Sequence, residues 1–168
     1  MRSVLVQLAL LVLPTLLLAQ AKPAVVTPEA LKADAEHAKA TADATTGEPC
    51  TEICLDAAKK LAELSNQNFT DGQVEPAQAA MKDAGKYAEK AGRASIDTRK
   101  RQKQTEIGLR RLTKRMKDIV QTLNFEDRPP IEQIIKSIEA VRSDLLLNMF
   151  GNPKKTFDEP DSKKKEKQ

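Results

Sequence analysis

The amino-acid sequence predicts an all-α protein: an elongated antiparallel helical bundle, with coiled-coil-like hairpins around one long central helix and no β-sheet. Two observations lead to this fold class. The 168-residue chain contains no Trp, one Tyr and four Phe, but it is rich in Ala, Leu, Lys, Glu and Gln, which favour helices strongly. Its apolar residues also recur at alternating spacings of three and four, which places them on one face of a helix.

The first 21 residues have the pattern of a secretory signal peptide. Arg2 is their only charge, residues 4–18 are almost wholly aliphatic, and Ala19-Gln20-Ala21 places small residues at a cleavage site. A transmembrane anchor needs about 20 apolar residues, and Pro14 interrupts this shorter run. We therefore expect residues 1–21 to be cleaved, and the chain to be periplasmic or extracellular with no transmembrane anchor.

Three segments follow the signal peptide. Residues 22–47 read as a weak N-terminal helix or linker, and residues 48–150 as the helical bundle domain. Residues 151–168 are rich in Lys, Pro and acidic residues. Because such a segment buries too little apolar surface to offset its ordering entropy, we expect a disordered, Lys-rich tail.

The first predicted helix runs from Thr27 to about Thr41. Thr27 is a suitable N-cap, and Pro28 suits the first helical position. Its apolar stripe is Leu31 followed by three alanines. Since alanines bury little area, we expect this helix to be loosely attached.

A second helix is predicted from Glu48-Pro49 to about Asn66, with a heptad seam that includes Cys50 and Cys54. Four residues apart on a helix, two Cα atoms lie about 6 Å apart, near the upper end of the disulfide range. An exported chain with two cysteines favours a disulfide. Two buried thiols and an intermolecular bridge remain as alternatives.

One unbroken helix is predicted from Val74 to Leu123, because the three–four spacing continues throughout and no proline falls between Gln78 and Arg128. It would be about 75 Å long, and glycines predict a bend near Gly92 or Gly108. Its seam becomes polar midway, which indicates a solvated rod or a joint for a partner helix. The polar seam residues are Ser95, Thr98, Gln102 and Thr105.

The last helix is predicted to begin after Pro129-Pro130, to carry an isoleucine-rich stripe from Ile131, and to end at Gly151. Short connections make neighbouring helices antiparallel. We therefore expect the second helix to fold onto the first half of the long helix, and the last helix to fold onto its second half.

Charge is distributed unevenly within the formal net charge of +4. Residues 22–75 contain five Lys and ten acidic residues, whereas residues 93–117 contain ten basic residues and two acidic ones. On one helix the basic side chains would form a sleeve about 36 Å long. They are Arg93, Arg99, Lys100, Arg101, Lys103, Arg110, Arg111, Lys114, Arg115 and Lys117.

This basic segment predicts an anion-binding site. Like charges four residues apart, as at Arg110 and Lys114, weaken a helix, so their presence favours an anionic partner. The candidates are an anionic envelope component, such as lipid headgroups, lipopolysaccharide or a cell-wall polymer, and an acidic protein. An ordinary solvated helix surface is the alternative. Nucleic acid is not expected, because the segment has no aromatic residue on which bases could stack.

Residues 107–125 also read as a basic amphipathic helix, a pattern typical of membrane surfaces. The apolar last helix offers a simpler partner for its apolar side. We therefore expect this side to pack in the core.

The sequence shows no catalytic or metal-binding motif, so we expect neither an enzyme nor a cofactor. His37 is the only histidine, and two cysteines with one histidine fall short of a four-ligand zinc site. The leading hypothesis is an exported, non-catalytic helical interaction protein. One alternative is a structural protein that forms a homodimer through the polar seam.

A second alternative is an envelope-stress-type helical chaperone. Leu112-Thr113-Lys114-Arg115-Met116 is similar to the Leu-Thr-x-x-Gln signature of these small bacterial proteins, but it differs at the final position. The resemblance covers this short stretch, and no residue role is carried over from it.

Overall fold

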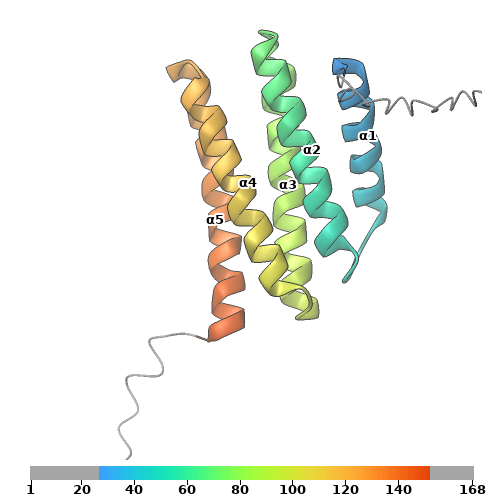
Figure 1. The fold of residues 1–168 in the computed structure, drawn as a ribbon. Coiled ribbons are helices and arrows are strands. Elements are labelled where there is room, and N and C mark those ends of the chain that lie inside the picture. Colours follow the sequence, from blue (N-terminus) through green and yellow to red (C-terminus); the bar gives the residue numbers. More distant parts are fainter. Residues whose placement is uncertain (1–26, 152–168) are drawn as a thin grey trace, which may run out of the picture.

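The computed structural model describes residues 27–151. The predicted signal peptide, and the predicted tail beyond Gly151, lie outside the described residues. Within residues 27–151 the fold is all-α, as predicted, with helices packed antiparallel and no strand. Figure 1 shows α2 and α4 in front of α3 and α5, with α1 at the edge next to α2.

The described chain forms five α-helices and one short 3-10 helix. Their bounds are α1 Pro28–Ala44, α2 Cys50–Thr70, α3 Val74–Thr98, α4 Gln102–Thr122, η1 Phe125–Asp127 and α5 Arg128–Phe150. Two predicted helix ends are confirmed. Thr27 caps α1 by accepting a hydrogen bond from the backbone N–H of Ala30 at 3.3 Å, and Gly151 follows α5 with a φ of 75° that favours glycine.

The prediction of one long helix from Val74 to Leu123 is wrong. The chain reverses direction after Thr98, and Arg99 and Arg101 adopt left-handed φ angles of 54° and 53°. One rod would let α5 pack on α4 but would keep α4 away from α2 and α3. The reversal adds these two neighbours, and Leu109 and Met116 are completely buried. Burial of such side chains stabilises the fold by about 1.5–3 kcal/mol each, which outweighs the cost of the turn.

The polar seam residues build this reversal. Ser95 Oγ donates a hydrogen bond to the carbonyl of Lys100 at 2.7 Å, and Thr105 Oγ1 donates to the carbonyl of Arg101 at 3.0 Å. Both hydroxyl side chains are buried. The seam is therefore polar because its side chains satisfy the backbone of a turn.

The predicted pairings of α2 with α3 and of α5 with α4 are confirmed, but α5 also packs along α3. Gly85 lies against Ile134 and Gly92 against Val141, so α3 and α5 run parallel. Gly108 of α4 lies against Leu55 of α2 in the same way. The three glycines are therefore points of close helix contact, and the predicted bend near Gly92 or Gly108 is replaced by the turn at residues 99–101.

The core is continuous from α1 to α5, and α4 contributes its large apolar residues to it. The prediction that the apolar side of α4 packs in the core is confirmed. By contrast, α1 buries three alanines, at positions 35, 38 and 42. Ion pairs also hold α1: Lys39 with Asp83, and Lys60 with Asp34 at 3.0 Å.

The predicted disulfide is confirmed by geometry. The sulfur atoms of Cys50 and Cys54 lie at disulfide distance, with their Cα atoms 5.1 Å apart. Both side chains are buried. The bridge therefore links two successive turns at the beginning of α2, beside the α1–α2 loop.

Candidate anion-binding surface

The structure places the ten predicted basic residues on three elements. Arg93 lies on α3, residues 99–101 form the turn, and the other six lie on α4. All ten are exposed. The prediction that they surround one continuous helix is wrong, because the chain reverses within the segment that carries them.

Four of the ten form ion pairs with acidic residues. Arg93 pairs with Glu89 at 3.4 Å on the same helix. The other three pairs join neighbouring helices: Arg101 with Glu52, Arg115 with Glu63 at 3.0 Å, and Lys117 with Glu139 at 2.6 Å. These three are structural contacts that place α4 between α2 and α5.

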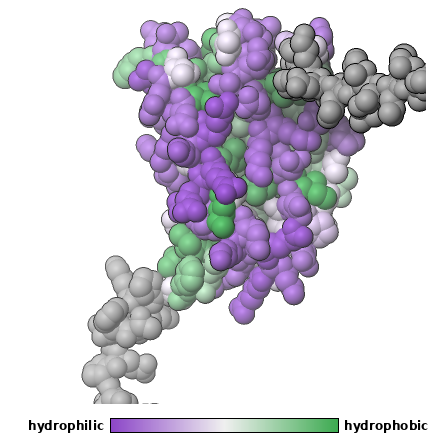
Figure 2. Space-filling view, viewed as in Figure 1, coloured by the Kyte–Doolittle hydropathy of each residue, from purple (hydrophilic) through white to green (hydrophobic). Residues whose placement is uncertain are grey.

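The other six form no ion pair with any residue in 27–151: Arg99, Lys100, Lys103, Arg110, Arg111 and Lys114. Lys103, Arg110 and Lys114 are seven and four residues apart, so they share one face of α4. Helix α4 carries two acidic residues that could neutralise these charges. Glu106 is bound to Arg142 at 2.8 Å, and Asp118 is exposed. Figure 2 shows the side of the molecule with α2 and α4 in front as mostly hydrophilic. We define the basic surface as these six residues.

The turn at residues 99–101 holds its basic side chains in an unfavourable backbone conformation. A left-handed φ costs a residue other than glycine roughly 1–2 kcal/mol. The chain nevertheless has Arg at both left-handed positions, with Lys100 between them. Strained backbone conformations of this kind are concentrated at functional sites.

A groove of about 840 Å³ crosses the N-terminal half of α2, between α1 and α4. Its apolar lining includes Ile53, Leu55 and Ile107, and its basic lining includes Lys59 and Arg111. We call this hollow the α2 groove. It adjoins the basic surface through Arg111, which belongs to both.

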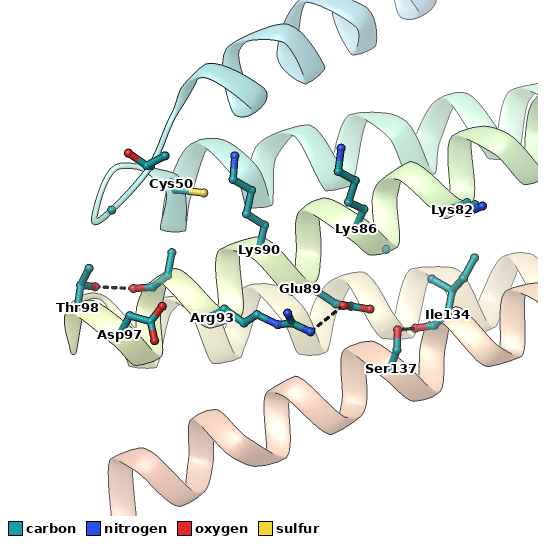
Figure 3. A pocket seen from close by; sticks show the side chains of 14 residues that line it. Cys50, Lys82, Lys86, Glu89, Lys90, Arg93, Asp97, Thr98, Ile134 and Ser137 are labelled. Atoms are coloured by element: carbon teal, nitrogen blue, oxygen red, sulfur yellow. Dashed lines mark hydrogen bonds and ion pairs between the residues drawn. The ribbon is translucent and has the colours of Figure 1, made fainter.

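A second groove, of about 620 Å³, runs along α3 between the α1–α2 loop and α5. Figure 3 shows Lys82, Lys86 and Lys90 in a row on α3, with Arg93 beyond them. These lysines were not among the residues predicted to form a site. Their spacing could have predicted the row, because lysines four residues apart lie on one face of a helix.

Internal partners occupy most of this lysine row. Lys90 donates a hydrogen bond to the carbonyl of Ala42 near the C-terminus of α1 at 2.6 Å, where a positive charge favours the helix dipole. Lys86 lies 3.5 Å from Asp43. Glu89 and Asp97 also line the groove. Since its positive charges are largely balanced, the basic surface on α4 is the stronger candidate site for anions.

Tyr87 lies beneath this contact between α1 and α3. Its side chain is fully buried, and its hydroxyl has no partner in hydrogen-bonding geometry among residues 27–151. Burial, and then the nearby Asp43 carboxylate, raises the pKa of Tyr87. The pKa of Asp43 is lowered, mainly by the Tyr87 hydroxyl and secondly by the charge of Lys86. Both shifts follow from the closeness of the Tyr87 hydroxyl to Asp43 near the end of α1.

His37 is exposed on α1 and is one of the residues that line the α2 groove. Within the described part of the chain, no three His, Cys, Asp or Glu side chains are grouped as a metal ion would require. Across residues 27–151, no helix has the length and apolar character needed to span a membrane. Comparison of the chain with protein-family models, curated proteins and solved structures gives no match.

Proposed function

We propose that the chain is an exported, non-catalytic interaction protein that binds an anionic partner through the turn at residues 99–101 and the exposed face of α4. One observation carries the proposal. Six basic side chains lie on this part of the fold without an acidic partner among residues 27–151, whereas the other four of the ten are paired.

Two energetic costs support the proposal. Arg99 and Arg101 occupy left-handed positions where glycine would be unstrained. Arg110 and Lys114 are like charges four residues apart, which weakens a helix by about 0.2–0.5 kcal/mol. An anionic partner would offset both costs on binding. Such a partner is an anionic envelope component or an acidic protein.

The test compares two triple variants that change the net charge equally. Lys103→Gln/Arg110→Gln/Lys114→Gln neutralises the shared face of α4. Lys32→Gln/Lys82→Gln/Lys136→Gln neutralises three exposed lysines on other helices, none of which forms an ion pair within the described residues. The probes are phosphatidylglycerol vesicles and polyglutamate, each at several salt concentrations.

We expect the purified protein to bind at least one probe. The α4 variant should bind it more weakly and with a smaller salt dependence, because fewer charges are screened, and the control variant should bind like the parent. Equal weakening in both variants would show attraction by net charge alone and would overturn the proposal. Absence of binding by the parent would overturn it as well.

Dimerisation through the polar seam receives no support from the structure. The hydroxyls of Ser95 and Thr105 are buried and bonded within the chain. Gln102 donates a hydrogen bond to Asn148 of α5 at 2.5 Å. The seam therefore has little left to offer a second copy.

A further inference from the structure

Two of the basic residues that line the α2 groove form no ion pair within residues 27–151. Helices α2 and α4 run parallel here, since Glu52 pairs with Arg101 near their N-termini and Glu63 pairs with Arg115 further along. Between these two ion pairs, Leu55 lies against Gly108.

Lys59 and Arg111 lie at the same level of the two helices. Lys59 is four residues after Leu55 and four before Glu63, and Arg111 is three after Gly108 and four before Arg115. Both side chains are exposed, and both line the α2 groove. The neighbouring pairs along the two helices join an acidic to a basic residue, or a leucine to a glycine. At the position of Lys59 and Arg111, both helices carry a basic residue.

The acidic residues of the groove do not compensate this pair. Glu52 is bound to Arg101, and Asp56 lies 3.3 Å from Lys60. Two positive side chains that line one groove repel each other, and a carboxylate bound between them would replace this repulsion with two charge-assisted contacts. The level of Lys59 and Arg111 is therefore suited to a single negative group.

The rest of the groove is suited to an apolar group. Ile53 and Ile107 are half-buried, so part of each side chain is exposed toward the groove that they line. Leu55, which is buried at the contact of α2 with α4, lines the same groove. A ligand that fills the groove would cover these apolar side chains and remove them from water.

We propose that the α2 groove binds an acidic peptide segment of a partner protein, with one carboxylate between Lys59 and Arg111 and an adjacent apolar side chain over Ile53 and Ile107. The inference rests on the proposed function, because it narrows the anionic partner to an acidic protein. A flat headgroup layer does not enter a hollow. A dense polyanion would find few free positive charges here, because Arg101 and Lys60, which also line the groove, are already bound to acidic residues.

The experiment selects ligands from a phage-displayed library of short random peptides with the full, disulfide-bonded protein. The selected peptides should carry Asp or Glu beside an apolar residue. Loss of one charge-assisted hydrogen bond weakens binding by about tenfold or more, so the Gln or Asn version of each peptide, and the protein variant Lys59→Glu, should each show at least that loss. The control Lys82→Glu changes an exposed lysine of α3 that lines the second groove and not the α2 groove, and it should bind like the parent.

Selected peptides without an acidic residue, or peptides that bind the Lys59→Glu variant as well as the parent, would overturn the inference. So would the absence of any enriched peptide. Lys59 does not belong to the basic surface, so the two proposals fail separately. If vesicles bind as described above and no peptide is enriched, the groove inference fails and the proposed function stands. If neither binds, both fail.

Discussion

Gly92 of α3 lies directly against Val141 of α5, so that a Cβ atom at position 92 would overlap with Cγ1 of Val141. Gly85 has the same relation to Ile134, seven residues earlier on both helices. The two contacts fix α3 and α5 as close parallel neighbours. Helix α3 is also in contact with α2 and α4.

Gly92→Ala should destabilise the protein, although alanine favours helices by about 1 kcal/mol over glycine. Overpacking costs typically 1–3 kcal/mol, and Val141 cannot relieve it easily because its γ-carbons are fixed by a stiff χ1 in a helix. We expect a net loss of about 1–2 kcal/mol in the free energy of unfolding, measured by urea denaturation. The Gly92→Ala/Val141→Ala double variant should lose less stability than the sum of the losses in the two single variants, because the smaller side chain at position 141 makes room for the added Cβ.

Gly108→Ala is the matched control for this prediction. The added Cβ would meet Cδ2 of Leu55, the end of a flexible side chain that can move aside. We expect a smaller loss than at Gly92. A gain in stability at Gly92 would show that α3 and α5 are not in close contact there.

Arg99→Gly should stabilise the protein and weaken its binding to anions. The left-handed φ of 54° at this position is unstrained for glycine, so we expect a gain of about 1 kcal/mol in the free energy of unfolding. Loss of the guanidinium should weaken binding to whichever anionic probe the parent binds. Arg101→Gly should gain less stability, because it also removes the ion pair with Glu52. An unchanged affinity for Arg99→Gly would exclude this arginine from the binding surface.

Acid should loosen α1. The pKa of Asp43 is lowered from its ordinary value of 3.8 by the Tyr87 hydroxyl and by Lys86. A carboxyl with a lowered pKa contributes stability above its ordinary value, and this stability is lost as the pH falls through the lowered one. The protection of α1 amides against hydrogen exchange, relative to unstructured chain at the same pH, should therefore fall below about pH 4. The Asp43→Asn variant should exchange faster in α1 already at neutral pH, with α5 unaffected; equal exchange rates in parent and variant would remove Asp43 from this contact.

Alkaline titration should give the complementary result, because Tyr87 is the only tyrosine in the chain. Burial raises its pKa above the ordinary value of 10.0. Stability from a buried neutral phenol is present below the ordinary value and is lost as the pH rises through the raised one. We expect phenolate absorbance to appear together with the loss of helical circular dichroism. Ionisation with a pKa near 10.0 in a fully helical protein would place Tyr87 outside the core.

Local patterns were sufficient to predict most of the helices. The Thr27-Pro28 pair predicted the start of α1, and Gly151 predicted the end of α5. The spacing of Cys50 and Cys54 placed both sulfur atoms on one helix face. Each of these features depends on residues within one or two helical turns, so the sequence alone carries the information.

The reversal at residues 99–101 has no such local signal. Its two left-handed positions are arginines, where glycine or asparagine would mark a turn, and the three–four spacing continues through Ser95 and Thr105. The decisive gain is tertiary, since the apolar side of α4 packs back onto α3. The α2 groove could not be predicted either, because Lys59 and Arg111 come together only through the parallel arrangement of α2 and α4.

The basic surface and the α2 groove both require the chain to reverse between α3 and α4. The most direct test is a distance measurement between spin labels at Lys82→Cys and Asp118→Cys, two exposed positions on α3 and α4, with the Cys50–Cys54 disulfide intact. The antiparallel arrangement predicts a distance of about 30 Å or less, from two neighbouring helices and their side chains. A distance of about 54 Å, the length of one continuous helix between these positions, would contradict the account.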